Sequence, residues 1–173
     1  MLELRFTRRF SMGHRLIAGA AETCALPHGH NEFVSVRLVS TRPAPLDGHA
    51  NMLVPFEQAK ARWHRFVDER LDHALQLNEA DPLLAWFRAN EPARAARIIV
   101  TPGDPTTELM ACLLSAKLGA ILADAGGLLR CAGIQIEETP TNTVSFDGDP
   151  RDLLPARGPP EACWWHRPDM DIS

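Results

Sequence analysis

The sequence of 173 residues lacks the features that mark membrane, nucleic-acid-binding and secreted proteins. No apolar run approaches the roughly 20 residues that a membrane-spanning helix needs, so we expect no association with a membrane. Lys and Arg number 18 against 22 Asp and Glu, and no basic stripe is visible, so nucleic acid is not an expected partner. The N-terminus alternates between apolar and polar residues, unlike a signal peptide, which predicts a cytoplasmic protein.

Cysteine is sparse and tyrosine is absent. The four cysteines lie far apart and form no CxxC pair, which excludes a zinc ribbon and argues against a disulfide-dense secreted scaffold. Hydrophobic residues make up 45% of the chain and charged residues 23%, as in an ordinary globular protein. The length then predicts one domain with a sizeable core.

Hydrophobic periodicity predicts an α+β domain. Apolar and polar residues alternate over residues 2–10, 33–40, 129–138 and 143–146, which predicts four strands. Apolar residues recur at steps of three and four over residues 55–76, which predicts a helix. A second helix is predicted between a start signal at residues 104–108 and the glycine pair at 126–127. The order ββααββ favours an antiparallel sheet with both helices on one face.

Three segments fall outside this pattern: residues 11–32, residues 79–104 and residues 147–173. The first is predicted to be a loop, because glycine and proline interrupt it. The second is predicted to be an irregular insertion with one helical turn near residues 83–87 and a short strand-like run. The third predicts a C-terminal extension that winds over the surface, with its Trp-Trp pair as a buried anchor. The predicted organisation is therefore a domain of residues 1–146 followed by this extension.

Three histidines near the N-terminus suggest a metal site. His28 and His30 flank a glycine, and on an extended backbone both rings point to the same side of the chain. His14 is the natural third ligand, because antiparallel pairing of the first two strands would bring it opposite the pair. Three imidazoles with an open fourth position are typical of catalytic zinc. The alternative is three unrelated loop histidines, and the spacing alone does not decide between them.

Candidate proton-transfer groups lie near this histidine pair or at the end of the first predicted helix. Cys24 precedes His28 by four residues, and a thiol beside a metal can be held as the reactive thiolate. The alternative is a buried, inert cysteine. Asp72 and His73 are adjacent, and an aspartate can orient a neighbouring histidine for acid–base work. The alternative for this pair is a solvated acid and a helix-end cation.

A carboxylate falls on the otherwise apolar face of the third predicted strand. Glu138 shares this face with Ile134 and Ile136, so its charge needs a partner, and the guanidine-like edge of a heterocycle would serve. Glu108 is either a second binding carboxylate or a favourable charge in the first turn of its helix.

Five short motifs in a fixed order resemble the 6-pyruvoyl-tetrahydropterin synthase and 6-carboxy-tetrahydropterin synthase family. The resemblance covers roughly residues 4–146, and this chain departs from the family's usual residues at Gly13, Glu32 and Pro55. The matching motifs are Phe10-Ser11-Met12-Gly13-His14, Cys24-Ala25-Leu26-Pro27-His28-Gly29-His30-Asn31, Leu71-Asp72-His73 with Leu77-Asn78, Pro105-Thr106-Thr107-Glu108, and Glu138-Thr139.

This resemblance implies a tunnelling fold, in which four-stranded antiparallel sheets with two helices on one side join into a barrel. It implies a homo-oligomer, a trimer or hexamer, with active sites at subunit boundaries. The residues that it implies are His14, His28 and His30 as ligands of zinc (Zn2+), Cys24, Asp72 and His73 for proton transfer, Glu138 to hold the pterin ring, and Thr106 and Glu108 as further substrate-binding residues.

The activity that the resemblance implies is zinc-dependent and uses 7,8-dihydroneopterin triphosphate. One branch of the family eliminates triphosphate and yields 6-pyruvoyl-tetrahydropterin. The other also releases acetaldehyde and yields 6-carboxy-tetrahydropterin, on the route to queuosine, and the spacing around Cys24 favours this branch. The alternatives are a paralogue that acts on another pterin and a zinc- and pterin-binding protein without activity. A zinc hydrolase lacks support, because no HExxH-like spacing supplies a general base.

Overall fold

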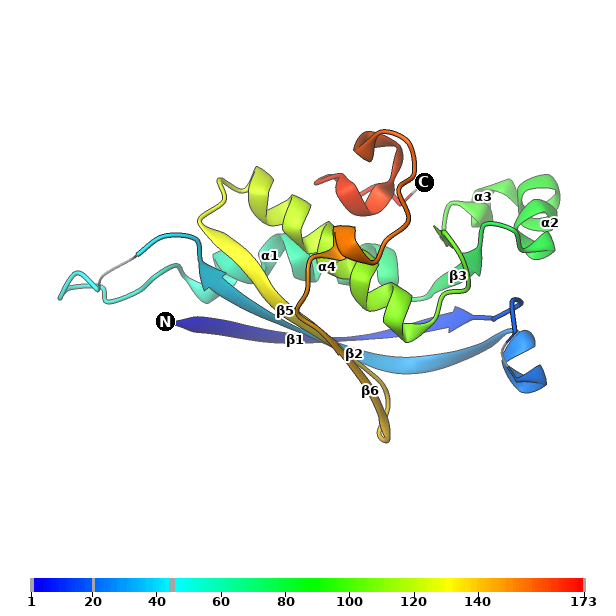
Figure 1. The fold of residues 1–173 in the computed structure, drawn as a ribbon, viewed down its shortest axis with the longest axis horizontal. Helices are drawn as coiled ribbons and strands as arrows, with labels where there is room; N and C mark the ends of the chain where they lie inside the picture. Colours follow the sequence, from blue (N-terminus) through cyan, green and yellow to red (C-terminus); the bar gives the residue numbers. More distant parts are fainter. Residues whose placement is uncertain (1, 20, 44–45, 173) are drawn as a thin grey trace.

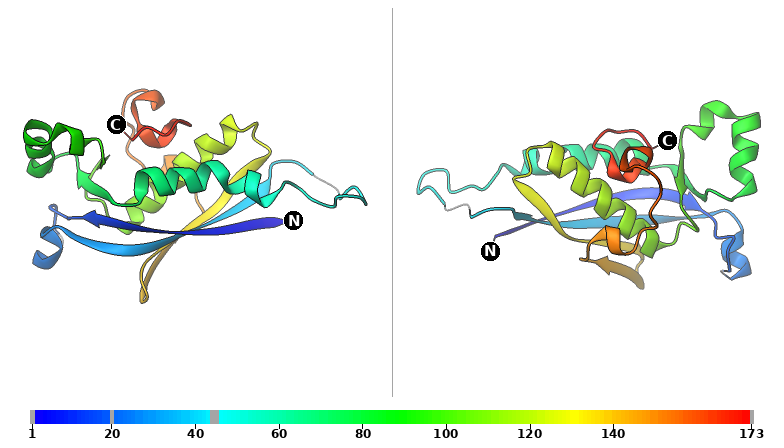
Figure 2. Two further views of the ribbon diagram at one scale, coloured as in Figure 1. Left: turned by 180° about the vertical axis from the view of Figure 1, so that it is seen from behind. Right: turned by 45° about the horizontal axis from the view of Figure 1, so that its top comes forward.

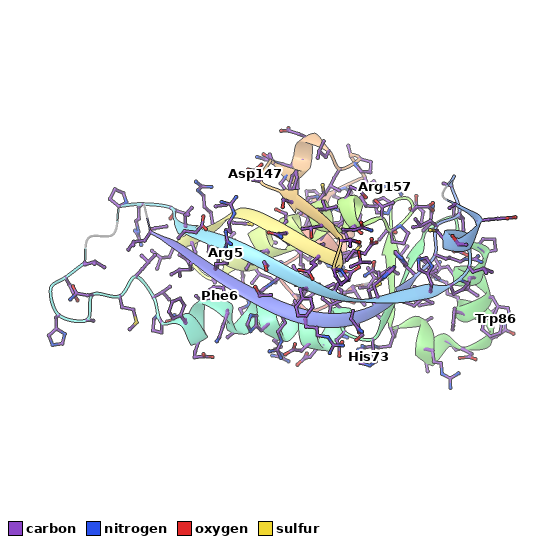
Figure 3. The ribbon with its side chains drawn as sticks, turned by 90° about the horizontal axis from the view of Figure 1, so that it is seen from below. Arg5, Phe6, His73, Trp86, Asp147 and Arg157 are labelled. Carbon is purple, nitrogen blue, oxygen red and sulfur yellow. The ribbon has the colours of Figure 1, made fainter. Side chains whose placement is uncertain are left out.

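The computed structural model describes residues 2–19, 21–43 and 46–172, and it shows one curved sheet with helices on one face (Figure 1). The six strands run in the spatial order β4-β3-β1-β2-β5-β6. Figure 3 looks onto the face of the sheet that no helix covers. The strands are β1 (Glu3–His14), β2 (His28–Ser40), β3 (Ala74–Asn78), β4 (Ile98–Thr101), β5 (Leu129–Thr139) and β6 (Asn142–Phe146), and the helices are α1 (Phe56–Phe66), α2 (Pro82–Asn90), α3 (Pro92–Ala95) and α4 (Thr107–Asp124).

The prediction of four antiparallel strands and two helices was therefore too simple. β3 pairs in parallel with the end of β1, and β4 pairs in parallel with β3. The helix predicted over residues 55–76 ends earlier, because α1 passes into a π-helical turn over Val67–Leu71 and His73 then adopts a left-handed backbone with φ of 61°. Leu71, Ala74 and Leu77 are all buried. Their spacing of three suits one face of a helix, and β3 is too short and too buried on both faces to show the alternation of a strand, which is why periodicity did not reveal it.

The first two strands are longer than predicted and turn much of the expected 11–32 loop into sheet. Their register places His14 opposite His28 and Met12 opposite His30. Gly29 lets the two backbones approach, since a Cβ built on it would lie 2.4 Å from the carbonyl oxygen of Met12. The connecting loop is therefore limited to residues 15–27.

Other predictions for the fold are confirmed. α4 follows the start signal, although Thr106 and not Asp104 is its N-cap, and β5 and β6 lie within a residue of the predicted ranges. The insertion of residues 79–104 contains two short helices where one turn was predicted, and its strand-like run forms β4. Among the described residues, no helix is both long and apolar enough to cross a membrane.

The core lies between the helix-covered face of the sheet, α1 and α4. The C-terminal extension covers the outer side of these helices (Figure 2). It does more than wind over the surface, because Trp164 and Trp165 are only 3% and 5% exposed, as the predicted anchor requires. The indole nitrogen of Trp164 also donates a hydrogen bond to the carbonyl of Val100 in β4 at 3.0 Å.

A buried lysine attaches the extension to α4. Lys117 is fully buried, and its ammonium donates hydrogen bonds to the carbonyls of Trp164 (3.0 Å), Arg167 (2.8 Å) and Asp171 (3.5 Å). The ammonium also lies 5.0 Å from the centre of the Phe66 ring. Burial lowers the pKa of Lys117 to about 8, against the attraction of Asp169, so the side chain is still mostly protonated at pH 7.

Replacing this lysine is expected to loosen the extension. Lys117→Met should lower the free energy of unfolding by about 3 kcal/mol, because three buried carbonyls lose their donor. The measurement is urea unfolding followed by tryptophan fluorescence. The chain's other lysine provides the control: Lys60 pairs with Glu57 along α1, and Lys60→Met should change stability by less than about 0.5 kcal/mol. Equal stability of the two variants would show that Lys117 does not hold the extension.

Candidate metal centre and its cleft

The three histidines predicted as metal ligands come together at the loop end of β1 and β2. One ring nitrogen from each of His14, His28 and His30 lies within 4.8 Å of the others. The Nε2 atoms of His14 and His28 are 3.0 Å apart. The strand register produces this cluster, because it places His14 beside His28 and lets His30 project from the same face two residues along β2.

Hydrogen bonds to backbone carbonyls fix how two of the rings are protonated. His14 uses Nδ1 toward the carbonyl of Pro105 at 3.0 Å, and His28 uses Nδ1 toward the carbonyl of Leu26 at 2.8 Å. A carbonyl only accepts, so each Nδ1 carries a proton, and the Nε2 of a neutral ring then carries a lone pair. Burial, the main cause, lowers the pKa of His14 and keeps this ring neutral.

Two lone pairs that face each other at 3.0 Å repel unless a cation lies between them. Zinc binds histidine nitrogen at about 2.0–2.1 Å, and tetrahedral angles then separate two ligand nitrogens by about 3.3 Å. The observed separation is close to this value, and carbonyl partners on the outer ring nitrogens are usual for metal-ligating histidines. The three side chains therefore fit a metal ion such as zinc, with room for a further ligand from the cleft.

A cleft of about 540 Å³ opens beside the cluster and contains five of the predicted site residues. Its walls come from the β1–β2 loop, the N-terminus of α4, the end of β5 and the start of β6. The predicted residues that line it are His14, Cys24, Thr106, Glu108 and Glu138. The rest of its lining is Leu16, Thr107 and residues 141–144.

The carboxylate of Glu138 is held in place at this cleft. Its Oε1 accepts a hydrogen bond from Thr107 Oγ1 at 2.8 Å. Thr106, the neighbouring residue, caps α4 by accepting from the amide of Leu109. The sequence argument did not single out Thr107 by itself, although it belongs to one of the matched motifs. The cleft residues of β6 carried no signal in the sequence.

Asp72 and His73 form the predicted pair but lie outside this cleft. His73 Nδ1 bonds Asp72 Oδ2 at 2.8 Å, and the other carboxylate oxygen accepts from the amide of Ser11 at 2.8 Å. The Ser11 amide and then the His73 ring hold the pKa of Asp72 below its usual range. The His73 side chain is 78% exposed at the junction of β1 and β3 (Figure 3). Within one chain, the pair and Cys24 are therefore not in one site.

A second carboxyl group lies buried within reach of the charge of Glu138. Glu32 follows His30 on the same face of β2 and is only 3% exposed. Among the described residues, no group forms a hydrogen bond with its carboxyl. Burial, helped by the nearby charge of Glu138, raises the pKa of Glu32 to about 8. The sequence marked this residue only as a departure from the family's aromatic residue.

The raised pKa of Glu32 predicts a pH dependence in the metal-free protein. The folded chain binds a proton that the unfolded chain has lost between about pH 4.5 and 8, so this group's contribution to stability falls as pH rises through that window. Glu32→Gln removes the effect. Relative to the parent chain, the variant should be more stable at pH 8 by about 2–4 kcal/mol and nearly unchanged at pH 5.

Denaturant unfolding at pH 5, 6.5 and 8 measures this difference. Glu137→Gln is the matched control, because Glu137 lines a shallow hollow with Thr7, Ser35 and Gln135 away from the metal centre. The free energy of unfolding of Glu137→Gln should differ little from that of the parent chain at each pH. A Glu32→Gln difference that does not grow with pH would contradict the prediction.

The fold and the histidine cluster define an α+β protein with a candidate metal-dependent site. Residues 3–149 match the 6-pyruvoyl tetrahydropterin synthase family. The chain therefore belongs to the 6-pyruvoyl tetrahydropterin synthase family, as the motifs implied. The C-terminal extension beyond residue 149 lies outside the match.

Two curated relatives carry more specific names. A probable 6-carboxy-5,6,7,8-tetrahydropterin synthase of Halobacterium salinarum is 29% identical over 136 residues, which cover 79% of this chain and 80% of the relative. A 6-carboxy-5,6,7,8-tetrahydropterin synthase of Rickettsia felis is 26% identical over 117 residues, which cover 66% of this chain and 80% of the relative.

Solved structures share the fold. A protein of Wolinella succinogenes has a TM-score of 0.63 at 21% identity, and the alignment covers 86% of this chain and all of that one. The 6-pyruvoyl tetrahydropterin synthase of Caenorhabditis elegans has a TM-score of 0.55 at 21% identity, with 86% and 96% covered. The chain thus shares the α+β fold of these structures, with β3 and β4 as additional strands relative to the prediction.

Proposed function

We propose that the protein is a zinc-dependent lyase that converts 7,8-dihydroneopterin triphosphate to 6-carboxy-5,6,7,8-tetrahydropterin. The observation that carries the proposal is the convergence of the His14, His28 and His30 nitrogens at a cleft that also presents Cys24 and Glu138. The names of the two curated relatives support the carboxy product over the pyruvoyl product. The substrate is a pterin, which has a guanidine-like edge that a carboxylate can hold.

Each cleft residue has a role that its position suits. Glu138 would accept hydrogen bonds from the amino and ring N–H groups of the pterin, with its second oxygen held by Thr107. Thr106 and Glu108 would contact the substrate from the end of α4. Zinc, when bound, would lower the pKa of the side-chain hydroxyls that it contacts. Cys24 would take and return protons at the side-chain carbons beside the histidine cluster.

Asp72 and His73 would complete the site from a second copy of the chain. The pair is exposed and preformed, because Asp72 is fixed by the Ser11 amide and holds the His73 ring by a hydrogen bond. A side chain with 78% exposure is free to enter a neighbouring cleft. We therefore propose a homo-oligomer, a trimer or hexamer, with active sites at subunit boundaries.

Product identification tests the proposal. The zinc-loaded protein is incubated with 7,8-dihydroneopterin triphosphate, and the products are identified by mass. 6-Carboxy-tetrahydropterin with acetaldehyde supports the proposal. The 6-pyruvoyl product would retain the family chemistry but contradict the assigned branch. No turnover by protein with one zinc per chain would contradict the proposed reaction and favour an enzyme with another pterin substrate or a binding protein.

A further inference from the structure

The loop of residues 15–27 carries Cys24 and is bonded back to its own first residues. It includes the 3-10 turn η1 (Glu22–Ala25), none of whose residues is buried. The amide of Leu16 donates a hydrogen bond to the carbonyl of Cys24 at 2.8 Å. The position of Cys24 is therefore linked to residues 15–18, which we name the strap.

Two carboxylates outside the loop hold the strap, one near each of its ends. Arg15 forms a two-point ion pair with Asp81, with Nε to Oδ2 at 2.6 Å. The amide of Ala18 donates to Asp104 Oδ2 at 2.7 Å. Both acids belong to the insertion of residues 79–104, which lies at the same end of the molecule as the loop (Figure 1).

Further hydrogen bonds hold these two carboxylates in place, so they can fix the position of the strap. The Asp81 side chain is fully buried and also accepts from the amide of Leu83 at 2.8 Å. Asp104 uses its other oxygen to accept from Asn78 Nδ2 at 2.8 Å, at the end of β3. Burial alone would raise the pKa of Asp81, but the Arg15 guanidinium and the Leu83 amide outweigh it and hold the pKa below its usual range.

The residues that directly follow the insertion contact the rest of the site. Pro105, next to Asp104, supplies the carbonyl that orients His14. Thr107, two residues further, holds Glu138. Residues 104–107, where the insertion meets α4, thus contact the strap, the predicted metal ligand His14 and the carboxylate of Glu138.

We propose that Asp81 and Asp104 are positioning residues for Cys24, which they act on through the strap. This inference rests on the proposed function, in which Cys24 transfers protons. Neither carboxylate lines the cleft. Loosening the strap should move the thiol relative to the histidine cluster while the Glu138 contact remains, so the chemical step should slow more than substrate binding weakens.

The test uses Asp81→Asn and Asp104→Ala in the zinc-loaded full chain. We expect kcat to fall about 10- to 100-fold with KM within about threefold and one metal per chain retained. Hydrogen exchange of the strap and Cys24 amides should accelerate at least about tenfold. Glu79→Gln is the matched control: Glu79 belongs to the same insertion, but its ion pair is with Arg157 of the C-terminal extension, so the substitution leaves the strap contacts untouched. It should behave as the parent chain does.

The outcomes separate this inference from the proposed function. Unchanged exchange at the strap, unchanged kcat, or a rise in KM alone would overturn it. Should Asp81→Asn fail to fold, Asp104→Ala at its less buried position decides. Should the parent chain show no turnover, the proposed function fails. Two rates then decide whether the carboxylates position this thiol. They are the hydrogen-exchange rate of the strap and the rate at which iodoacetamide alkylates Cys24, which is measured by peptide mass.

Discussion

Replacing His30 by alanine should abolish stable metal binding and turnover together. The parent chain should retain one zinc per chain after dialysis, and His30→Ala should retain almost none, because two imidazoles leave the ion with too few protein ligands. Turnover of 7,8-dihydroneopterin triphosphate should fall at least about 10³-fold, since proton removal from the substrate then lacks the metal's effect on pKa. Metal analysis and product formation are measured on the same samples.

His30 is the ligand to change, because it is half-exposed and, unlike His14 and His28, its ring has no hydrogen bond to a backbone carbonyl among the described residues. His49→Ala is the matched control, since His49 is exposed in the β2–α1 connection, away from the cluster. It should keep both zinc and activity. Full zinc content in His30→Ala would show that the three histidines are not the metal site. Zinc loss with full activity would show that the reaction needs no metal.

Replacing Cys24 should remove turnover while the metal stays. Cys24 lines the cleft with His14 and Glu138 but is not part of the histidine cluster. Cys24→Ala should therefore keep one zinc per chain and lose about 10²–10⁴-fold in kcat, the usual contribution of a positioned acid–base group. KM should change little, because Glu138, which Thr107 holds in place, still binds the substrate. Steady-state kinetics with zinc analysis measure both quantities.

The matched control is Cys112→Ala, at a cysteine on the inner side of α4. Burial raises the pKa of the Cys112 thiol, so this group stays protonated, and it lies in the core away from the cleft. Its replacement should cost some stability and leave kcat unchanged. Equal, measurable kcat in Cys24→Ala and the parent chain would show that Cys24 takes no part in the reaction. Absence of turnover in both would favour a binding protein.

Several elements could be predicted from the sequence because their signals are local. α4, β5 and β6 were found from periodicity and end signals within windows of 10 to 20 residues. The face shared by His28 and His30 follows from the alternation of a strand, and the bond between Asp72 and His73 follows from their adjacency. Glu138 was found because a carboxylate interrupts an apolar face.

Other features depend on contacts between distant parts of the chain. β3 exists because the edge of β1 offers unpaired backbone groups to residues 74–76, while the side-chain spacing there suits a helix equally well. His73 lies away from Cys24, and Asp81 and Asp104 bind the strap. Each of these relations involves residues more than 45 positions apart in the sequence. No short-range pattern records such pairings.

By itself, the sequence determined the alternating faces, the helix ends and the residue types that the chemistry needs. Each of these depends on the period of one strand or helix and is settled within a few turns of chain. Only the tertiary structure decided that three histidine nitrogens converge and that Cys24 and Glu138 share their cleft. Those distances depend on which strand edges pair, in which register, and on a partly buried ion pair between the insertion and the loop.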